Sequence, residues 1–285
     1  MENFLRGQVC LVTGGAQGIG WAISQALADH GAQVFICDIS KESLARAAEE
    51  LTTLPWADRI TLSRCDVTAR AEIEGWITKV YGQTGRIDVL VNNAAFVKWN
   101  DVAEMTVQEA ICTMEVGYNG TVYGIKAVLP LMQAAGRGHI VNMGSSAGGI
   151  FIGGASAAYA AVKAAIDGYT QTLQIELKDS PVNVTLVRLA TVAGTDFFGK
   201  HVAPSRLPRM GDFMSYLTPP QVAEGVVRAI HKRRAVLHMP RYLALFYLAF
   251  ALAPGLLRRL TAVGGGGRRD YGQVEWRYPS KDGES

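Results

Sequence analysis

Short apolar runs that alternate with longer helical patterns are the feature that most restricts how this chain can fold. Seven such runs, rich in β-branched residues, have the length of buried strands. They cover residues 8–13, 33–38, 59–66, 87–93, 138–143, 182–189 and 235–240. Apolar strands separated by helices are typical of a parallel sheet covered on both faces. Right-handed crossovers then predict an α/β, Rossmann-like doubly wound sheet, with ligands at the carboxyl ends of its strands.

The chain is organised as one domain followed by two C-terminal segments. With 285 residues it is long enough for one sizeable core. We expect residues 1–240 to form this domain, with a helical lid at about 195–217, and residues 264–285 to form a flexible tail. Residues 241–263 form an apolar helical extension, of which 242–257 carry no charge. A spanning helix needs about 20 residues, and Pro254 with Gly255 would end this one.

Composition and charge exclude several classes of protein. Apolar residues make up 49% of the chain and charged residues 19%, which indicates a globular protein. The net charge of +3 is too small to indicate a nucleic-acid partner. Cys10, Cys37, Cys65 and Cys112 lie far apart in the sequence, so we expect reduced thiols, without a disulfide or a metal site. No signal-peptide pattern is present, and we expect a cytoplasmic protein.

A glycine-rich turn joins the first predicted strand to the first predicted helix. The turn reads TGGAQGIG over residues 13–20. Its glycines allow a tight bend, let the backbone approach a pyrophosphate and bring the helix close to the strand. The helix then points its free N–H groups and positive dipole end at the phosphates. The turn predicts a dinucleotide site formed by Gly14, Gln17, Gly18, Ile19 and Gly20.

Asp38 ends the second predicted strand, 24 residues after Gly14. A carboxylate at this position can accept hydrogen bonds from both hydroxyls of the adenosine ribose. The alternative role of an N-cap for the next helix is one that Ser40 can fill. A 2′-phosphate would meet the negative charge of Asp38, and the neighbouring residues in the sequence offer no cation to offset it. The sequence therefore favours NAD(H) over NADP(H).

Five motifs in this order resemble those of the short-chain dehydrogenase/reductase family, over roughly residues 5–240. They are TGGAQGIG, Asp66-Val67, NNAA at 92–95, NMGSSAG at 142–148 and YAAVK at 159–163. The resemblance implies hydride transfer between a nicotinamide and an alcohol or ketone. Besides the glycine-rich turn and Asp38, the cofactor residues that it implies are Asp66 and Val67 at the adenine, Asn93 and Ala94 in a loop that Asn92 supports, Tyr159, Lys163 and Val192.

The resemblance implies a catalytic group of Ser145, Tyr159 and Lys163. Oxidising an alcohol requires a base for the hydroxyl proton, and the pKa of a free tyrosine, about 10, is too high for a good base near neutrality. Lys163 follows Tyr159 by one helical turn on the same face, so we expect its cation to stabilise the phenolate. A serine hydroxyl would donate to the substrate oxygen. Spacing from the strand favours Ser145, whereas spacing back from the tyrosine favours Ser146; we choose Ser145.

Two positions depart from the family pattern. Gly117 stands where relatives carry an asparagine that completes their tetrad, and the family mechanism places a relay water on the backbone carbonyl there. Glycine keeps this carbonyl and can adopt the local helix distortion that the asparagine supports. We expect an active enzyme in which Gly117→Asn changes turnover by less than about tenfold. Leu189 and Ala190 replace the usual Pro-Gly, but nucleotide binding should survive.

Aromatic and methionine side chains gather in the segments expected around the substrate. In the lid and after NNAA they are Phe197, Phe198, Met210, Phe213, Met214, Tyr216, Phe96 and Trp99. They favour a lipophilic small molecule such as a steroid, terpenoid, polyketide or acyl-type alcohol, although packing of the lid alone would give the same composition. The apolar extension would either line this site or lie on a membrane surface. By the resemblance, helices that include residues 123–132 and 159–177 form a homodimer or homotetramer.

Two other functions share these motifs. An epimerase that retains NAD would use the same groups, without net formation of NADH. A cofactor-binding regulator without turnover would have no need for a paired tyrosine and lysine. The sequence therefore predicts a short-chain alcohol dehydrogenase or ketoreductase that depends on NAD, and these two functions remain as alternatives.

Overall fold

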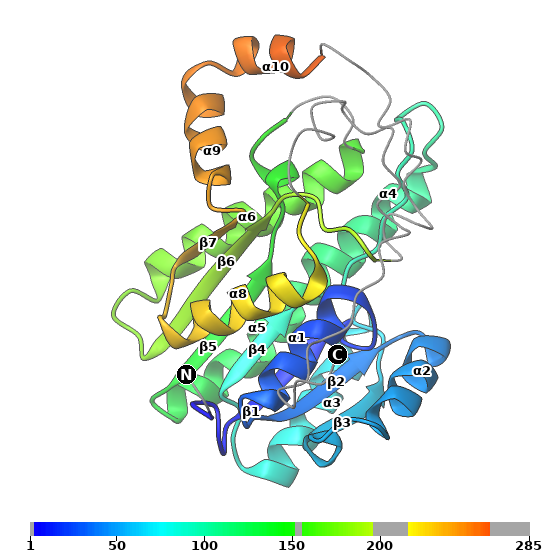
Figure 1. Ribbon diagram of the computed structural model, residues 1–285, viewed down its shortest axis with the longest axis vertical. Helices are drawn as coiled ribbons and strands as arrows, with labels where there is room; N and C mark the ends of the chain where they lie inside the picture. The colour runs from blue at the N-terminus through cyan, green and yellow to red at the C-terminus, as the bar shows by residue number, and fades with distance from the viewer. Residues whose placement is uncertain (1–2, 152–155, 196–215, 263–285) are drawn as a thin grey trace, which may run out of the picture.

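A seven-stranded parallel sheet forms the centre of the molecule (Figure 1). The computed structural model describes residues 3–151, 156–195 and 216–262. The strand order is β3-β2-β1-β4-β5-β6-β7, so the chain reverses its direction of winding between β1 and β4. The strands are β1 (Val9–Thr13), β2 (Gln33–Asp38), β3 (Ile60–Arg64), β4 (Val89–Asn92), β5 (Gly138–Met143), β6 (Val182–Leu189) and β7 (Val236–Met239). The predicted Rossmann-like doubly wound sheet is confirmed.

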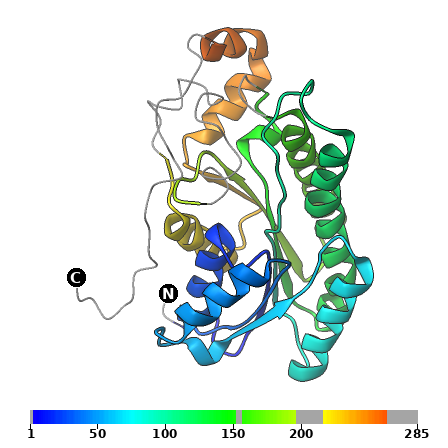
Figure 2. The same cartoon turned by 90° about the vertical axis from the view of Figure 1, so that its right-hand side faces the viewer.

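Helices cover both faces of this sheet, as Figure 2 shows with the sheet nearly edge-on. One face carries α1 (Gly18–Asp29), α2 (Lys41–Leu51) and α8 (Pro219–His231). The other carries α3 (Arg70–Thr84), α5 (Gly120–Ala134) and α6 (Ala157–Glu176). The remaining elements of the domain are α4 (Val107–Met114), the π-helical turn η2 (Glu115–Asn119) and the short 3₁₀ turns η1 (Ala57–Arg59) and η3 (Ser146–Gly148).

Continuous apolar strands fit this architecture because successive side chains point to opposite faces. In β1, Cys10 and Val12 join the core beneath α1 and α8. Val9 and Leu11 join the core beneath α3 and α5. All four side chains are buried. Neither face of β1 reaches water, so an alternating polar pattern would have left polar groups without solvent.

The second helix begins with a side-chain cap at Ser40. The Ser40 hydroxyl accepts a hydrogen bond from the backbone N–H of Ser43 at 3.1 Å. Such a cap satisfies one of the N–H groups that the first helical turn leaves unpaired. The expectation that Ser40, rather than Asp38, fills this role is confirmed, and the carboxylate of Asp38 lies outside the helix.

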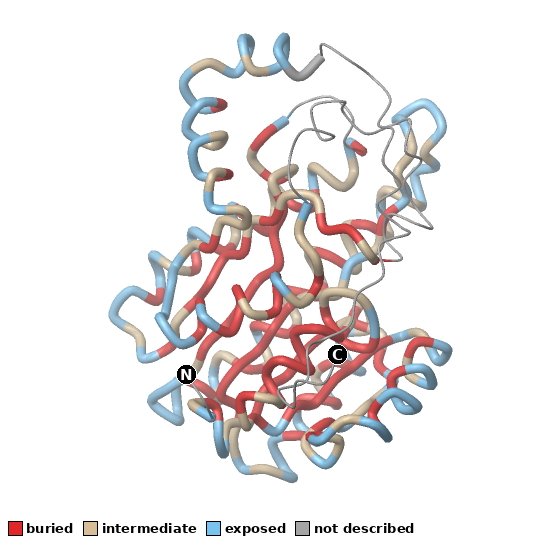
Figure 3. The backbone as a smooth tube through the Cα atoms, in the orientation of Figure 1, coloured by how far each residue is buried: buried red, intermediate tan, exposed pale blue. Residues whose placement is uncertain are grey.

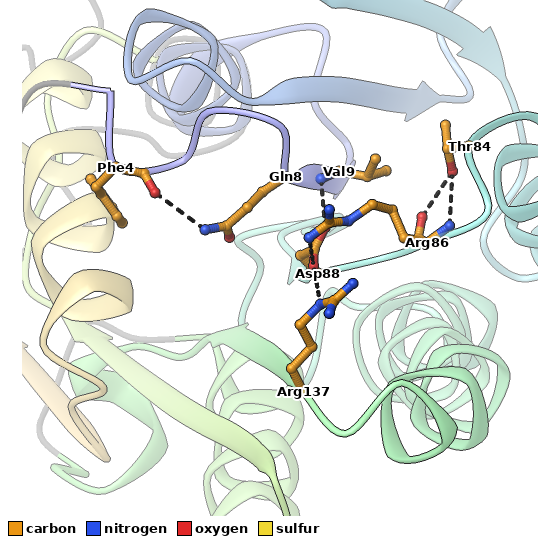
Figure 4. A network of polar contacts seen from close by, with 7 residues as sticks. All are labelled: Phe4, Gln8, Val9, Thr84, Arg86, Asp88 and Arg137. Carbon is orange, nitrogen blue, oxygen red and sulfur yellow. Dashed lines mark hydrogen bonds and ion pairs between the residues drawn. The ribbon is translucent and has the colours of Figure 1, made fainter.

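The amino end of the sheet, away from the strand ends that face the predicted site, is held by Asp88 (Figure 4). Its carboxylate accepts hydrogen bonds from the backbone N–H of Val9 at 2.8 Å, from Arg86 at 2.7 Å and from Arg137 at 3.0 Å. Burial alone would raise the pKa of Asp88, but these donors together hold it below its usual value. Asp88 therefore joins β1, β4 and the segment before β5 as a charged anchor.

The apolar extension forms two helices rather than the single one expected. The first, α9, covers Leu243–Leu252, and the second, α10, covers Pro254–Ala262. Pro254 does stop α9, but it then begins α10, because proline is well suited to the first turn of a helix. Among the described residues, no single helix is long and apolar enough to cross a membrane. The pair Leu243–Leu252 and Pro254–Leu260 meets that test only together, across a bend of 120°. The predicted lid and tail lie, apart from 195, 216 and 217, outside the described residues.

Candidate active site

The glycine-rich turn lies at the carboxyl end of β1, where α1 begins. Gly14 and Gly18 have φ values of +60° and +53°, which side chains strongly disfavour. A Cβ on Gly14 would lie 2.8 Å from Cα of Ala94, and one on Gly20 would lie 2.2 Å from the carbonyl oxygen of Gly14. The turn is therefore built of bare backbone in front of the first N–H groups of α1. Such a cradle fits a phosphate group.

Asn93 and Thr13 hold this turn against the end of β4. The Asn93 amide donates to the carbonyl oxygens of Gly14 at 2.8 Å and Thr13 at 3.1 Å. In return, the Thr13 hydroxyl accepts from the backbone N–H groups of Asn93 at 3.1 Å and Ala94 at 3.2 Å. The predicted pair Asn93 and Ala94 is thus placed at the turn. Thr13 was missed by the sequence reasoning, although its place at the strand end was a usable signal.

The side chain of Asn92 contacts the neighbouring strand β5 rather than the glycine-rich turn. Its amide donates to the side-chain oxygen of Asn142 at 2.8 Å, and the Asn142 amide donates to the Thr170 hydroxyl at 2.9 Å. This buried chain links β4, β5 and α6. Asn92 therefore supports the cofactor loop only through the sheet, while Asn93 contacts the turn itself.

The carboxylate of Asp38 lies beside the glycine-rich turn. It accepts hydrogen bonds from the backbone N–H groups of Ala16 at 3.2 Å and Ser40 at 3.0 Å. The side chain is buried, and the two bonds fix it at the end of β2. Two arginines that the sequence reasoning overlooked lie near Asp38, at the carboxyl end of β2. Arg64 is the β3 partner of Asp38 in the sheet register, and Arg46 of α2 donates to Ser43 at 3.3 Å.

The two residues predicted at the adenine, Asp66 and Val67, follow β3. Asp66 accepts two hydrogen bonds from Thr68, from its backbone N–H at 2.9 Å and from its hydroxyl at 2.8 Å. Val67 is buried, and a Cβ on Gly120 would lie 3.0 Å from its side chain. Among the other glycine-turn residues, Gln17 accepts a hydrogen bond from the Ser43 hydroxyl at 3.0 Å, while Ile19 packs at the edge of the core.

Ser145, Tyr159 and Lys163 come together at the carboxyl end of β5. The Ser145 hydroxyl lies close enough to the Tyr159 hydroxyl to favour the ionised form of the tyrosine. The Lys163 ammonium lies 5.7 Å from the centre of the Tyr159 ring and donates to the carbonyl oxygen of Met143 at 2.7 Å. Ser145 is buried and caps the turn η3, and its hydroxyl accepts from the N–H of Ala147. The structure thus places Ser145 beside the tyrosine, and the choice of Ser145 over Ser146 stays a prediction.

Burial dominates the electrostatics of this group. It lowers the pKa of Lys163 to about 8 and raises the pKa of Tyr159, an effect that the Ser145 hydroxyl only partly offsets. Lys163 is not among the groups that shift the pKa of Tyr159, so the expectation that its cation stabilises the phenolate stays a prediction. The positive charge of a bound nicotinamide ring would act in the same direction as Lys163.

Two aromatic side chains border this group. Trp99 packs against Tyr159, with ring centres 5.2 Å apart. Tyr247 of α9 donates a hydrogen bond to the backbone carbonyl oxygen of Ser145 at 3.0 Å. Its ring lies under the guanidinium of Arg188, which is 4.2 Å away. The sequence reasoning missed Tyr247 because no motif surrounds it.

The helix distortion expected at Gly117 is present. Residues 115–119 form a π-helical turn between α4 and α5, and Gly117 is buried within it. The Gly117 carbonyl accepts a hydrogen bond from the Thr121 hydroxyl at 2.7 Å. A Cβ on Gly117 would lie 2.6 Å from Cγ2 of Val162. The expectation that an asparagine would be accommodated here did not take this contact into account.

The segment after β6 lies near the glycine-rich turn. Val192 is buried and forms an isolated parallel bridge with Leu217. A Cβ on Gly18 would lie 3.7 Å from the Thr195 side chain, so Thr195 lies next to the start of α1. The aromatic and methionine residues predicted in the lid lie outside the described residues, except for Tyr216.

A family model described as short chain dehydrogenase matches residues 8–205. The chain belongs to this family. Short chain dehydrogenases are oxidoreductases, and relatives with such names are found. Oxidoreductase UcpA of Escherichia coli K12 is 35% identical over 183 residues, which cover 64% of this chain and 68% of that protein. Sorbitol dehydrogenase of Cereibacter sphaeroides is 35% identical over 211 residues, which cover 72% of this chain and 79% of that protein.

Solved structures of short chain dehydrogenases share the fold. A short chain dehydrogenase/reductase of Burkholderia phymatum in complex with NAD superposes with a TM-score of 0.77 at 22% identity, over 90% of this chain and 97% of the other. A metagenomic short-chain oxidoreductase in complex with NADP gives a TM-score of 0.66 at 28% identity, over 82% and 96%. The two differ in the cofactor that their titles name.

Proposed function

We propose that this protein is an NAD(H)-dependent oxidoreductase that interconverts a secondary alcohol and a ketone. The observation that carries the proposal is the grouping of Ser145 and Tyr159 with the buried ammonium of Lys163, which lies 5.7 Å from the centre of the tyrosine ring. This group lies at the same edge of the sheet as the glycine-rich turn, where ligands bind in doubly wound folds. Membership of the short chain dehydrogenase family supports it.

The residues present fit a dinucleotide. Glycines 14, 18 and 20 keep the turn as closely packed bare backbone in front of the first N–H groups of α1, a chemistry that fits phosphates, and Asp38 offers acceptors for ribose hydroxyls. By the family pattern, Asp66 and Val67 would border the adenine, Asn93 and Ala94 the inner ribose, and Val192 the carboxamide. A bound nicotinamide supplies the group that accepts or gives the hydride.

The protein's own residues move the proton. During oxidation, Tyr159 would take the proton of the substrate hydroxyl as the hydride leaves the carbon, and it would return a proton to the ketone oxygen in the reverse direction. Ser145 would donate a hydrogen bond to the substrate oxygen and keep it within reach of Tyr159. Lys163 would bind the nicotinamide ribose and, through its charge, favour the ionised tyrosine.

Replacing Tyr159 by phenylalanine tests this assignment. We expect Tyr159→Phe to abolish turnover and leave the dissociation constant of NADH, measured by fluorescence titration, nearly unchanged, because only the hydroxyl is removed. Ser145→Ala should reduce turnover strongly, whereas its neighbour control Ser146→Ala should not. Activity of Tyr159→Phe within a few-fold of the wild type would remove the tyrosine from its role, and loss in Ser146→Ala alone would show that we chose the wrong serine.

The preference for NAD(H) is a separate proposal. A 2′-phosphate would approach the carboxylate of Asp38, which is buried and fixed by two backbone N–H groups, and like charges repel there. Arg46 and Arg64 act in the opposite direction, but both are exposed and their charge is screened by salt.

Comparing kcat/KM for the two cofactors decides between these effects. We expect a higher value for NAD(H), and we expect Asp38→Ala to shift the ratio toward NADP(H). Arg46→Ala, near the same carboxylate, is the matched control and should shift the ratio further toward NAD(H). A tenfold or larger preference of the wild type for NADPH would contradict the proposal.

We propose a lipophilic substrate, because Trp99 and the apolar helix α9 lie next to Tyr159 and Ser145. The relative named sorbitol dehydrogenase favours a polyol instead. A panel of secondary alcohols that contains steroid, terpenoid, acyl-type and polyol members separates the two, and a clear preference for small polyols would end the lipophilic proposal.

Net formation of NADH in this assay also distinguishes a dehydrogenase from an epimerase, and turnover of any member excludes a non-catalytic regulator.

We also propose that the protein acts in the cytoplasm as a homodimer or homotetramer, with α5 and α6 at the interface. The support is the family resemblance and exposed apolar side chains on neighbouring helices, such as Val107, Ile111 and Ile175. Light scattering that shows a monomer at micromolar concentration would reject the oligomer.

A further inference from the structure

The outer side of α9 and α10 carries exposed leucines. Leu245, Leu248 and Leu252 follow one face of α9 at helical spacing, and Leu256 and Leu260 follow one face of α10. Each of the five is between 56 and 77% exposed. We call these five residues the leucine face. Large apolar side chains that gather on a surface in this way indicate an interaction site.

The opposite side of both helices is fixed to the domain. Leu243 and Phe250 of α9 form a small buried cluster with Ile150, against which Tyr247 also packs. Arg258 of α10 donates to the carbonyl oxygen of Phe151 at 3.1 Å and lies 5.4 Å from the centre of the Phe250 ring. The leucine face is therefore the side that the domain does not use, and Figure 3 shows most of the backbone of the two helices in pale blue, the colour of exposed residues.

The charges of this segment have one sign. Residues 241–262 contain three arginines, Arg241, Arg258 and Arg259, and no acidic residue. All three arginines are exposed. On α10, Arg259 lies three residues after Leu256 and directly before Leu260, so its charge borders the leucine face. Apolar side chains with bordering cations are the pattern of a helix that lies on an anionic membrane.

We propose that the leucine face binds the surface of an anionic lipid bilayer. Spanning is excluded for α9 alone, because its 10 residues measure about 15 Å, half of a hydrocarbon core. A second copy of this chain fits the face less well, since it would bring three further arginines and no carboxylate from the same segment. Tyr247 joins α9 to Ser145, so a bound membrane would lie close to the strand ends that form the proposed site. Lipid binding itself does not depend on the proposed activity.

Flotation of the purified full-length chain with lipid vesicles tests the proposal. Vesicles of phosphatidylcholine containing one-third phosphatidylserine should bind the protein, vesicles of phosphatidylcholine alone should bind it much less, and added salt should weaken binding. Leu252→Gln combined with Leu256→Gln should lower the partition coefficient on anionic vesicles about tenfold or more. The matched control, Tyr81→Gln with Val102→Gln, changes two exposed apolar residues outside α9 and α10 and should bind as the wild type does.

Charge reversal provides a second variant. Arg259→Glu should weaken binding to anionic vesicles, whereas Lys178→Glu, an exposed cation far from α10, should not. Light scattering of the leucine variant tests the alternative partner. No binding to anionic vesicles, or equal binding by the leucine variant and the wild type, would overturn the proposal. So would a smaller oligomer of the leucine variant together with absent lipid binding, which would assign the face to a second copy. Because no substrate is needed, a lipid-binding protein without turnover would contradict only the proposed function.

Discussion

Tyr247 gives the C-terminal extension a direct contact with the proposed catalytic serine. Its hydroxyl donates to the backbone carbonyl oxygen of Ser145, and its ring is held by the guanidinium of Arg188. Arg188 is itself fixed by two hydrogen bonds to Asp167, at 2.7 and 2.8 Å. Tyr247 touches no reacting atom in this arrangement. We therefore regard it as a positioning residue for Ser145.

Removing the hydroxyl of Tyr247 tests that role. We expect Tyr247→Phe to lower kcat by about two- to tenfold, the range that corresponds to one hydrogen bond of 0.5–1.5 kcal/mol. KM for the cofactor should stay the same, because the glycine-rich turn is not touched. Steady-state kinetics measure both. Tyr242→Phe is the matched control, since the buried Tyr242 hydroxyl has no hydrogen-bond partner. A Tyr247→Phe enzyme with unchanged kcat would leave the tyrosine with a structural role only.

The sequence allowed some site residues to be predicted and hid others for a physical reason. Ser145, Tyr159 and Lys163 belong to motifs whose spacing is set by one strand and one helix turn. Tyr247 lies 102 positions after Ser145, and no local pattern marks that contact. Cys37 and Cys65 show the same limit, because they lie far apart in the sequence but come close together at the ends of β2 and β3, where the backbone N–H of Cys65 donates to the carbonyl oxygen of Asp38 at 3.1 Å.

At the scale of single elements, the π-helical turn η2 replaces a regular helix at Gly117. Relatives are expected to carry an asparagine there, and this chain forms the distortion without it. The space that a side chain would need is taken by Val162, whose Cγ2 lies 2.6 Å from the position of a Cβ. Gly117 and Val162 are therefore complementary, and Val162 directly precedes Lys163 in α6.

Exchange of this pair gives a prediction that the single substitution does not. In contrast to the change of less than tenfold expected from the sequence, Gly117→Asn alone should lower kcat by more than tenfold, because Val162 must move and Lys163 with it. It should also lower the melting temperature. Adding Val162→Ala should restore much of the activity by removing the contact. Gly117→Asn with Ile166→Ala, which shortens another buried side chain of α6, is the control and should not be rescued. Equal kcat in the wild type and in Gly117→Asn would show that the site yields without cost.

Element boundaries could be predicted where one strong signal sets them. Strands β2, β5 and β6 were expected at their observed bounds, because turn residues flank each apolar run. The extension was predicted less well, since proline is compatible with both the end of one helix and the start of another. The positions of α9 and α10 depend on their contacts with Ile150 and Phe151, which lie about 100 residues earlier in the sequence.

For the whole molecule, the alternation of apolar strands and helices was sufficient to predict the parallel sheet. The central strands β1 and β4 are buried on both faces because helices cover both, and their apolar character is visible in the sequence itself. The pairing of β4 with β1 follows from the doubly wound pattern. The buried polar anchors of the sheet, among them Asp88 and His139, could not be predicted, since their partners come from several elements.

His139 makes the stability of the whole molecule depend on pH. It lies in β5, buried, with Nε2 at 2.7 Å from the Thr185 hydroxyl. That hydroxyl donates to the carbonyl oxygen of Arg234, so it accepts from His139, and the neutral ring carries its proton on Nε2. Burial, together with the nearby charge of Arg233, lowers the pKa of His139 from 6.5 to about 4.

Acid should therefore destabilise the fold through His139. Between pH 6.5 and 4 the unfolded chain binds a proton at this histidine that the folded chain does not, so the free energy of unfolding falls as the pH falls. The contribution reaches about 3 kcal/mol at pH 4.

Urea unfolding of the wild type and of His139→Gln at several pH values measures this contribution. Other groups, Asp88 among them, also respond to acid, so the difference between the two proteins is the quantity that counts. That difference should shrink as the pH is lowered, and a constant difference would assign the acid response to other groups.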